Sequence, residues 1–181
     1  MKNIFKYILV FLVAFSFQNC SSSSKVYATP EKLQTLLNSE NFTFVAEKAN
    51  PTGMDVIKVM NSISPAGSSQ VLDLSPGYFV KFSNGEMNVD LPYFGRMYVT
   101  NFDPNKNGFD FTSKKFTIDK SKSTQKKTLW VINVNDNQSI GQIYLEITKT
   151  GKAYISISST DRQAISYDGY ITENEVNENN L

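Results

Sequence analysis

The spacing of hydrophobic residues changes from a helical period to a strand period near residue 41. Before that point, Thr29 supplies an N-cap hydroxyl and Pro30 suits the first position of a helix. Apolar side chains then recur at the i, i+3, i+4 spacing of one helix face, at Leu33, Leu36 and Leu37. We therefore predict one short helix that ends near Ser39 and lies on a sheet.

Beyond residue 41 apolar and polar residues alternate, and the register of a first hairpin can be predicted. It closes on Asn84-Gly85, the preferred pair for a two-residue type I′ turn. The apolar pairs on one face are then Phe82 with Met87, Val80 with Val89, and Tyr78 with Leu91. The other face pairs Lys81 with Asn88 and Phe79 with Asp90. The turn and the hydrophobic pattern select the same register.

A second hairpin is predicted between Ile143 and Ile157. A two-residue turn at Thr150-Gly151 sets Lys149 against Lys152, which is an unfavourable pair. A three-residue loop with Gly151 in the left-handed conformation avoids this contact. It pairs Ile147 with Ala153, Leu145 with Ile155 and Ile143 with Ile157. The sequence therefore predicts the three-residue loop.

The rest of the chain also reads as strands separated by turns. The predicted strands are Phe42–Ala46, Met97–Phe102, Gly108–Ile118, Leu129–Val134 and Ile165–Ile171, with Val56–Met60 as a further candidate. Loops are expected at 50–53 and 64–69, and a turn at Ser75–Gly77. The count is about nine or ten strands, with no helical pattern between them. We predict a mainly β fold, a single antiparallel β-sandwich or small β-barrel with one short N-terminal helix.

The start of the chain is typical of an export signal. Lys2 and Lys6 form a positive region, and Tyr7–Phe17 is almost wholly apolar. A run of that length cannot span a bilayer, which takes about 20 residues, but it suits a signal peptide. The run is followed by Gln18, Asn19, Cys20 and then serines, which resembles the lipobox of bacterial lipoproteins despite Phe17 and Asn19 at positions that are usually aliphatic and small. The alternative is an ordinary signal peptide followed by a stray cysteine.

These features divide the chain into four parts. The predicted parts are a signal peptide at 1–19, a lipidated Cys20 with a Ser-rich tether over 20–28, a single β-rich domain at 29–171, and a flexible acidic tail at 172–181. The membrane is the first expected partner, through the lipid on Cys20. Ser21 is not the Asp that retains some lipoproteins in the inner membrane, which favours the outer membrane, facing the periplasm.

Composition excludes several kinds of chemistry. The 181 residues include 18 Lys+Arg, 17 Asp+Glu, one Cys and no His. A charge this close to zero provides no field for nucleic acid, and a chain without His has no Ser-His-Asp or Cys-His catalysis and no His-ligated zinc. No phosphate-binding Gly-rich loop or dinucleotide motif occurs. We expect no cofactor, no metal and no assigned catalytic residue.

Carboxylates and arginines are the remaining candidates for chemistry. The carboxylates most suited to acid–base work are Asp90, Asp161 and Asp168. Arg96 and Arg162 are the only arginines of the sequence, and arginine favours bidentate clamps, so an Arg96–Asp90 or Arg162–Asp168 pair is expected. Tyr93, Arg96 and Arg162 are the candidate ligand-binding residues.

Two loops and the aromatic residues each allow two interpretations. Asp103–Gly108 begins like a calcium loop, but Lys114 occupies the place of the bidentate Glu, which favours a hairpin loop that uses Asn107-Gly108 for positive φ. The basic loop at 120–127 either is solvated or contacts anionic head groups. The aromatic residues either pack the core or line an apolar ligand cavity, and packing is favoured.

Five stretches of the chain together resemble a known family. They are Asn41–Phe44, Gly77–Val80, Asp90–Arg96, Gly108–Ser113 and Asp161–Gly169. In this order they resemble domain-of-unknown-function family 4251, small lipoproteins of Gram-negative bacteria. The resemblance covers most of residues 30–171 and implies a lipoprotein signal and a mostly β domain. Its motifs are structural rather than catalytic, and it implies no activity.

The sequence therefore favours a lipid-anchored cell-envelope domain with a non-enzymatic binding or structural role. Its expected partners are the membrane, an apolar ligand or an envelope protein, and no nucleic acid. The alternative is a carboxylate-based hydrolase that acts on envelope glycan. That alternative requires two carboxylates from different strands, about 5–9.5 Å apart in a cleft.

Overall fold

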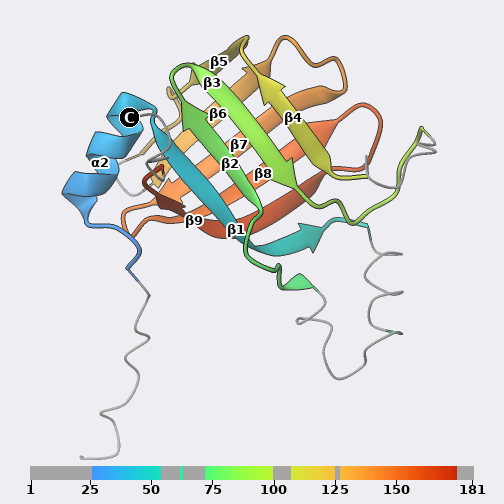
Figure 1. The fold of residues 1–181 in the computed structure, drawn as a ribbon, viewed down its shortest axis with the longest axis horizontal. Helices are drawn as coiled ribbons and strands as arrows, with labels where there is room; N and C mark the ends of the chain where they lie inside the picture. The colour runs from blue at the N-terminus through green and yellow to red at the C-terminus, as the bar shows by residue number, and fades with distance from the viewer. Residues whose placement is uncertain (1–25, 54–61, 63–71, 100–106, 125–126, 175–181) are drawn as a thin grey trace, which may run out of the picture.

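In the part of the chain that the structure describes, one sheet of nine antiparallel strands and one helix form the fold (Figure 1). The computed structural model describes residues 26–53, 62, 72–99, 107–124 and 127–174. The strands are β1 Phe42–Pro51, β2 Phe79–Ser83, β3 Glu86–Leu91, β4 Phe109–Ser113, β5 Phe116–Asp119, β6 Lys127–Val134, β7 Ile140–Thr148, β8 Lys152–Ser159 and β9 Ile165–Thr172. The predicted mainly β fold is confirmed.

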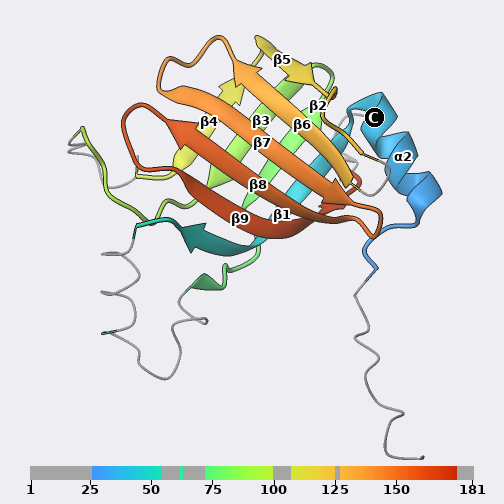
Figure 2. The same cartoon turned by 180° about the vertical axis from the view of Figure 1, so that it is seen from behind.

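The sheet coils into a nearly closed barrel, with its strands in the order β4-β3-β2-β1-β9-β8-β7-β6-β5 (Figures 1 and 2). Its centre is the pair of β1 and β9, which lie at opposite ends of the described chain. Phe44 pairs with Ile171 in this ladder, and a bulge follows between Ala46 and Lys48. Glu47 is the extra residue of the bulge, so the strand bends there. The two halves of the sheet are therefore joined by contacts between segments that are distant in sequence.

Helix α2, Pro30–Ser39, has the bounds that its sequence predicts. The Thr29 hydroxyl accepts a hydrogen bond from the Lys32 N–H at 3.4 Å, which satisfies one free donor of the first turn. Leu33 and Leu36 are buried, and Leu37 packs partly against the core. The helix lies beside one end of the barrel in both views (Figures 1 and 2).

Both predicted hairpin registers are confirmed, except that β2 begins at Phe79, so the predicted Tyr78–Leu91 pair is not part of the ladder. Phe82 pairs with Met87, and Asn84 and Gly85 both have the positive φ of a type I′ turn, 53° and 77°. In the second hairpin Ile147 pairs with Ala153, and Gly151 adopts a φ of 80°. The β-turn expected around Gly77 is also present, with a φ of 124° at that glycine.

Two strand predictions differ from the structure. Within the described part of 97–102, Met97 forms only an isolated bridge with Arg162, and 98–99 form a bend. The single strand predicted at Gly108–Ile118 is two strands, β4 and β5. Strand β1 also continues to Pro51, through the first part of the predicted loop at 50–53. The Val56–Met60 candidate and the 64–69 loop lie outside the described residues.

The break between β4 and β5 is a corner held by Asp136. Its carboxylate accepts hydrogen bonds from the Ser113 hydroxyl at 2.6 Å and from the backbone N–H groups of Lys114 and Lys115 at 2.7 and 3.0 Å. Three donors on one carboxylate stabilise its ionised form and lower the pKa of Asp136, with the Ser113 bond as the largest cause. The corner links β4 and β5, the two edge strands of the sheet.

Aromatic rings fill the barrel interior around Trp130. The centroid of Phe42 lies 5.0 Å from that of Phe82 and 5.2 Å from that of Trp130, and the Phe82 and Trp130 centroids are 5.8 Å apart. All three side chains are at most 1% exposed. These edge-on and tilted contacts are the geometry that aromatic cores prefer. These three aromatic residues therefore pack the core, as the favoured interpretation of the aromatic pattern predicts.

The segment just before the helix belongs to the folded domain. The Tyr27 and Ala28 N–H groups donate to the Thr150 carbonyl, at 2.9 and 3.4 Å. The Tyr27 ring stacks on Tyr170 with centroids 4.5 Å apart, and its hydroxyl donates to Glu47 at 3.0 Å. Tyr27 and Ala28, the last two residues assigned to the tether, are therefore docked on the sheet.

The other end of the domain is also fixed beyond residue 171. Strand β9 includes Thr172, and the Asn174 amide donates to the Phe82 carbonyl at 2.8 Å while its oxygen accepts from Thr43 at 2.7 Å. The predicted signal peptide, Cys20 and the remainder of the predicted tail lie outside the described residues. Within the described ranges, no helix has the length and apolarity to cross a bilayer. The buried apolar residues of these ranges all lie between Ala28 and Ile171, so residues 21–181 contain what this core needs to fold.

Candidate functional site

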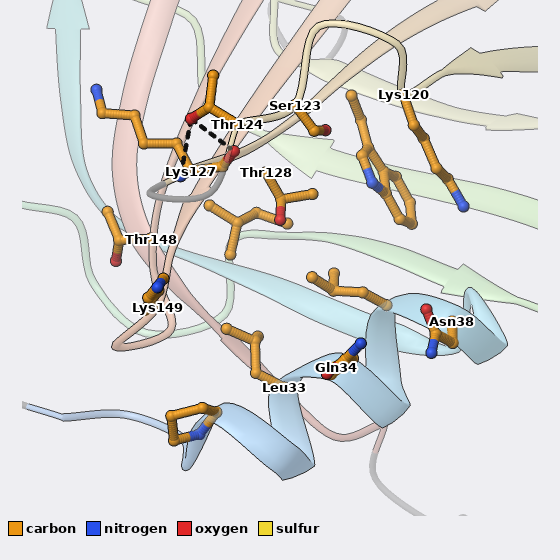
Figure 3. Close-up of a pocket in the computed structure, with 14 residues that line it drawn as sticks. Leu33, Gln34, Asn38, Lys120, Ser123, Thr124, Lys127, Thr128, Thr148 and Lys149 are labelled. Atoms are coloured by element: carbon orange, nitrogen blue, oxygen red, sulfur yellow. Dashed lines mark hydrogen bonds between the residues drawn. The ribbon is translucent and has the colours of Figure 1, made fainter.

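A pocket of about 480 Å³ separates helix α2 from strands β6 and β7 (Figure 3). We call it the α2 pocket. Its lining comprises Pro30, Leu33, Gln34, Leu37, Asn38, Lys120, Ser123, Thr124, Lys127, Thr128, Trp130, Ile147, Thr148 and Lys149. The helix, the segment before β6 and the β7–β8 loop all contribute to it. The site is therefore built from three segments that the fold brings together.

The helix gives the pocket one apolar wall and two amides. Gln34 and Asn38 stand four residues apart, so they share a face of α2, and both are exposed (Figure 3). Leu33 and Leu37 contribute the apolar surface on the same side. Neither amide makes a side-chain hydrogen bond with another described residue. Each amide offers two donors and an acceptor to a molecule in the pocket.

Three lysines line the α2 pocket, and two of them are paired. Lys120 bonds Glu40 at 2.6 Å, and its ammonium also lies 4.4 Å from the Trp130 ring centroid. Lys127 bonds Glu146 at 2.7 Å. Among the described residues, Lys149 has no ion pair. Of the described lining lysines, Lys149 on the β7–β8 loop is therefore the one whose charge has no carboxylate partner.

The floor of the pocket is the edge of the aromatic core. Trp130 and Ile147 reach the lining while remaining 1% exposed. The Ser123 hydroxyl accepts from the Leu129 N–H at 3.0 Å and donates to the Leu129 carbonyl at 3.1 Å, which fixes the segment before β6. Amides, a hydroxyl-rich loop and a cation over an apolar floor suit a ligand with a polar anionic group and a small apolar part.

The three candidate ligand-binding residues from the sequence meet at a different place, near the β8–β9 loop. Tyr93 donates its hydroxyl to the Arg96 carbonyl at 2.8 Å and contacts the Gln163 carbonyl at 3.1 Å. The Arg162 guanidinium carbon lies 5.1 Å from the Tyr93 ring centroid and 4.9 Å from that of Phe109. Burial raises the pKa of Tyr93. These residues are brought together as an internal clamp.

Arg162 is engaged by the protein itself. Its Nε and Nη2 atoms donate to the two oxygens of Asp161, at 3.1 and 3.0 Å, and Nη1 donates to the carbonyls of Asn107 and Gly108, at 2.9 and 3.1 Å. The residue is 8% exposed. The bidentate clamp expected of an arginine is present, but its partner is Asp161 and not Asp168. The Arg162 pair lowers the pKa of Asp161.

The candidate carboxylates occupy separate places. Asp90 lies on the outer face of β3, directly opposite Asp110 of β4. Asp161 belongs to the Arg162 clamp, and Asp168 on β9 accepts from the Asn50 amide at 2.7 Å. No described hydrogen bond or ion pair joins two of the three candidates. Asp110 and Asp161 do line one smaller pocket, of about 290 Å³.

The Asn107-Gly108 step has a different role from the one its sequence suggested. Gly108 has no positive φ, and a Cβ built on it would lie 2.8 Å from the Leu91 carbonyl oxygen. The glycine is needed for close approach of two backbones, next to the carbonyls that Arg162 binds. Residues 103–106 of the candidate calcium loop lie outside the described ranges. Among the described residues, no group of three potential metal ligands occurs.

Sequence reasoning identified the basic loop of the α2 pocket but missed the helix amides and Lys149. Gln34 and Asn38 carry the i, i+4 spacing of one helix face, which is the signal that was available. In the sequence, Lys149 carries only the signal of a turn residue. Nothing in the sequence reveals that the β7–β8 loop lies beside α2, because that proximity depends on how the sheet coils.

The fold defines the class of this protein as a nearly closed antiparallel β-barrel with a polar pocket beneath a flanking helix. Residues 25–171 match the family described as Domain of unknown function (DUF4251), and the chain belongs to that family. The family indicated by the five sequence stretches is thereby confirmed. No curated protein matches the chain.

Proposed function

We propose that this protein is a lipid-anchored cell-envelope domain that binds a ligand in the α2 pocket without transforming it. One observation carries the proposal: the pocket gathers the amides of Gln34 and Asn38 and the ammonium of Lys149, none of which has a side-chain partner among the described residues. Polar groups left without protein partners at a concave site are available to a ligand. The lysines and amides of the pocket suit binding rather than proton transfer.

The proposed anchor is lipid on Cys20, and the proposed place is the outer membrane, facing the periplasm. The apolar run at Tyr7–Phe17, the cysteine after it and the serines beyond support this assignment. A protein with two or three acyl chains stays on a membrane, because each buried CH₂ contributes about 0.8 kcal/mol.

The anchor is tested by the chemistry of the mature N-terminus. The full chain, made in a Gram-negative host with an alkyne-labelled fatty acid, is expected to incorporate label and to begin at Cys20 with a diacylglyceryl group. Cys20→Ser is expected to abolish the label, whereas the neighbouring Ser22→Ala retains it. Label in Cys20→Ser, or a mature terminus elsewhere in the wild-type protein, contradicts the anchor.

Binding is tested by native mass spectrometry of residues 21–181 produced in the periplasm. The wild-type protein is expected to retain a small molecule, and Gln34→Ala/Asn38→Ala is expected to lose it. Gln138→Ala, an exposed amide away from the α2 pocket, serves as the control and retains the ligand. A protein that is always empty, or a ligand retained by the double variant, contradicts the proposal.

Carboxylate-based hydrolysis is the second candidate function and has weaker support. Asp110 and Asp161 share a pocket, as a two-carboxylate mechanism requires. However, Arg162 binds both Asp161 oxygens and Ser159 donates to one of them, which lowers the pKa of Asp161 and holds it ionised. A general acid needs a raised pKa. Loss of a glycan-cleaving activity in Asp110→Asn would favour this candidate over binding.

A further inference from the structure

The docked N-terminal segment fixes which part of the barrel lies nearest to the proposed anchor. Tyr27 and Ala28 bond the Thr150 carbonyl, so the chain leaves the domain beside the β7–β8 loop. Lys149 precedes Thr150 in that same loop and lines the α2 pocket. The exit of the chain and the uncompensated lysine are therefore neighbours.

The length of chain between this exit and Cys20 is short. Five residues lie between Cys20 and Val26, and the six residue steps from one to the other reach at most about 20–22 Å when extended. A lipid on Cys20 would hold the β7–β8 loop within that distance of the membrane surface. Charges on the membrane surface act over about one Debye length, which is about 8 Å at physiological salt. A loop on so short a tether repeatedly comes within that distance of the surface.

The charge and shape of the α2 pocket match one kind of group on that surface. Among the described lining residues, Lys120 and Lys127 are neutralised by Glu40 and Glu146, which leaves Lys149 as the lysine without a carboxylate partner. A phospholipid phosphodiester carries a single negative charge. The amides of Gln34 and Asn38 can bond the hydroxyls of a glycerol head group, and Leu37 offers apolar contact to the first methylenes of the lipid.

We propose that the α2 pocket binds the head group of an anionic phospholipid in the membrane that carries the anchor. Lys149 contacts the phosphate and the α2 amides contact the polar head. Bound in this way, the domain sits with α2 and the β7–β8 loop against the bilayer. The inference rests on the proposed anchor for its orientation, but the head-group site itself does not require the lipid on Cys20.

The site is tested with residues 21–181, which lack Cys20 and contain the complete core. Binding is measured by co-sedimentation with vesicles of phosphatidylcholine alone and of an equal mixture with phosphatidylglycerol. We expect binding only to the anionic vesicles. Lys149→Gln is expected to weaken it about fivefold, since one lysine near an anionic surface contributes about 1 kcal/mol.

Lys115→Gln is the matched control. Lys115 is also exposed, and its carbonyl accepts from Asn135 at the start of the β6–β7 connection. The nine residues of β7 place that connection and Lys149 at opposite ends of a strand roughly 30 Å long. Equal effects of the two substitutions, or equal binding to both kinds of vesicle, would overturn the proposal.

A second measurement separates a lipid site from a general phosphate site. Amide resonances of residues 21–181 are followed during titration with short-chain dihexanoyl phosphatidylglycerol and, separately, with inorganic phosphate. Shifts at the Gln34 and Asn38 side chains with the lipid alone support the proposal. Equal shifts with inorganic phosphate, or lipid shifts confined to other surfaces, overturn it. Because neither assay needs Cys20, failure here leaves the anchoring test unaffected.

Discussion

Arg162 combines the features that make a buried charge tolerable. Its donors reach a carboxylate and two backbone carbonyls, and two aromatic rings cover its faces. The sequence indicated a geometric role for this arginine because arginine is so rare in the chain. It could not indicate the partner, because Asp161 is adjacent in sequence and Asp168 is equally plausible by spacing. Only the path of the β8–β9 loop decides between them.

Removal of Arg162 is expected to destabilise the domain strongly. Arg162→Ala leaves Asp161 and two carbonyls without their donor, and loss of one partner of a buried pair costs about 3–5 kcal/mol. Arg162→Lys keeps the charge but not the fork, so we expect a loss of about 1–2 kcal/mol. Urea unfolding measures both. Arg96→Lys, on an exposed side chain, is the control, and equal losses at 96 and 162 would contradict the clamp.

Asp90 is expected to reduce stability at neutral pH. Burial, and then the charge of the opposing Asp110, raises the pKa of Asp90 above its usual 3.8. A raised pKa means that the folded state favours the protonated carboxyl, so stability is lost as pH rises through the folded pKa. Asp90→Asn is therefore expected to stabilise the protein by about 0.5 kcal/mol at pH 7 and to have no effect below about pH 3.

Asp136→Asn is a control for which the expected change in stability has the opposite sign. The pKa of Asp136 is lowered, so its contribution is present above the unfolded value and is lost as pH falls through the folded pKa. This variant is expected to be less stable than the wild type at pH 7, and the difference shrinks in acid. Urea midpoints across the acid range measure both variants. The same sign for Asp90→Asn and Asp136→Asn would contradict this electrostatic account.

At the scale of elements, the sequence predicts the hairpin registers, which a local turn determines. It does not predict the break between β4 and β5, which depends on a carboxylate distant in sequence. Asn84-Gly85 and Gly151 fix their hairpins through local backbone preference, so both registers were predictable. The corner between β4 and β5 depends on Asp136, which follows β6. A run of alternating residues gives no signal for such a break. The pattern over Gly108–Ile118 therefore predicts one strand where the structure has two.

The two hairpin glycines differ in what surrounds them, and this difference can be measured. An alanine in the left-handed conformation costs about 1–2 kcal/mol, and Gly85→Ala is expected to cost only this, because no atom lies within 4 Å of an added Cβ. At Gly151 the added Cβ would lie 3.2 Å from the Ala28 nitrogen and 3.3 Å from the Tyr27 Cβ. We expect Gly151→Ala to cost more, and to speed hydrogen exchange at Tyr27 and Ala28.

Hydrogen exchange gives this comparison a clear negative outcome. If the segment docks as described, exchange at Tyr27 and Ala28 rises in Gly151→Ala and stays unchanged in Gly85→Ala. Unchanged exchange in both variants would show that the N-terminal segment does not depend on the β7–β8 loop. The orientation inferred for the α2 pocket would then lose its structural basis, while the head-group site would remain to be tested by lipid binding.

At the scale of the whole molecule, the strand order was beyond prediction because its central pair is non-local. The pattern gave a mainly β fold and left sandwich and barrel open. The barrel results from β1 pairing with both β2 and β9, which unites the two halves of the sheet. The α2 pocket depends on the same non-local arrangement, since its lining comes from the helix and from β6 and β7. A pocket whose lining comes from segments distant in sequence has almost no local sequence signal.

Because the pair of β1 and β9 forms the centre of the sheet, we predict that the domain folds only when β9 is present. A chain that ends at Ala164 keeps the other eight described strands but leaves β1 and β8 without their common partner, which exposes two interior edges and the Phe44 region of the core. We expect it to show no cooperative urea transition and to aggregate. A chain that ends at Asn174 keeps every strand and is expected to unfold in one step. Trp130, buried in the wild type, reports both by fluorescence, and a cooperative transition in the shorter chain would mean that the halves of the sheet fold independently.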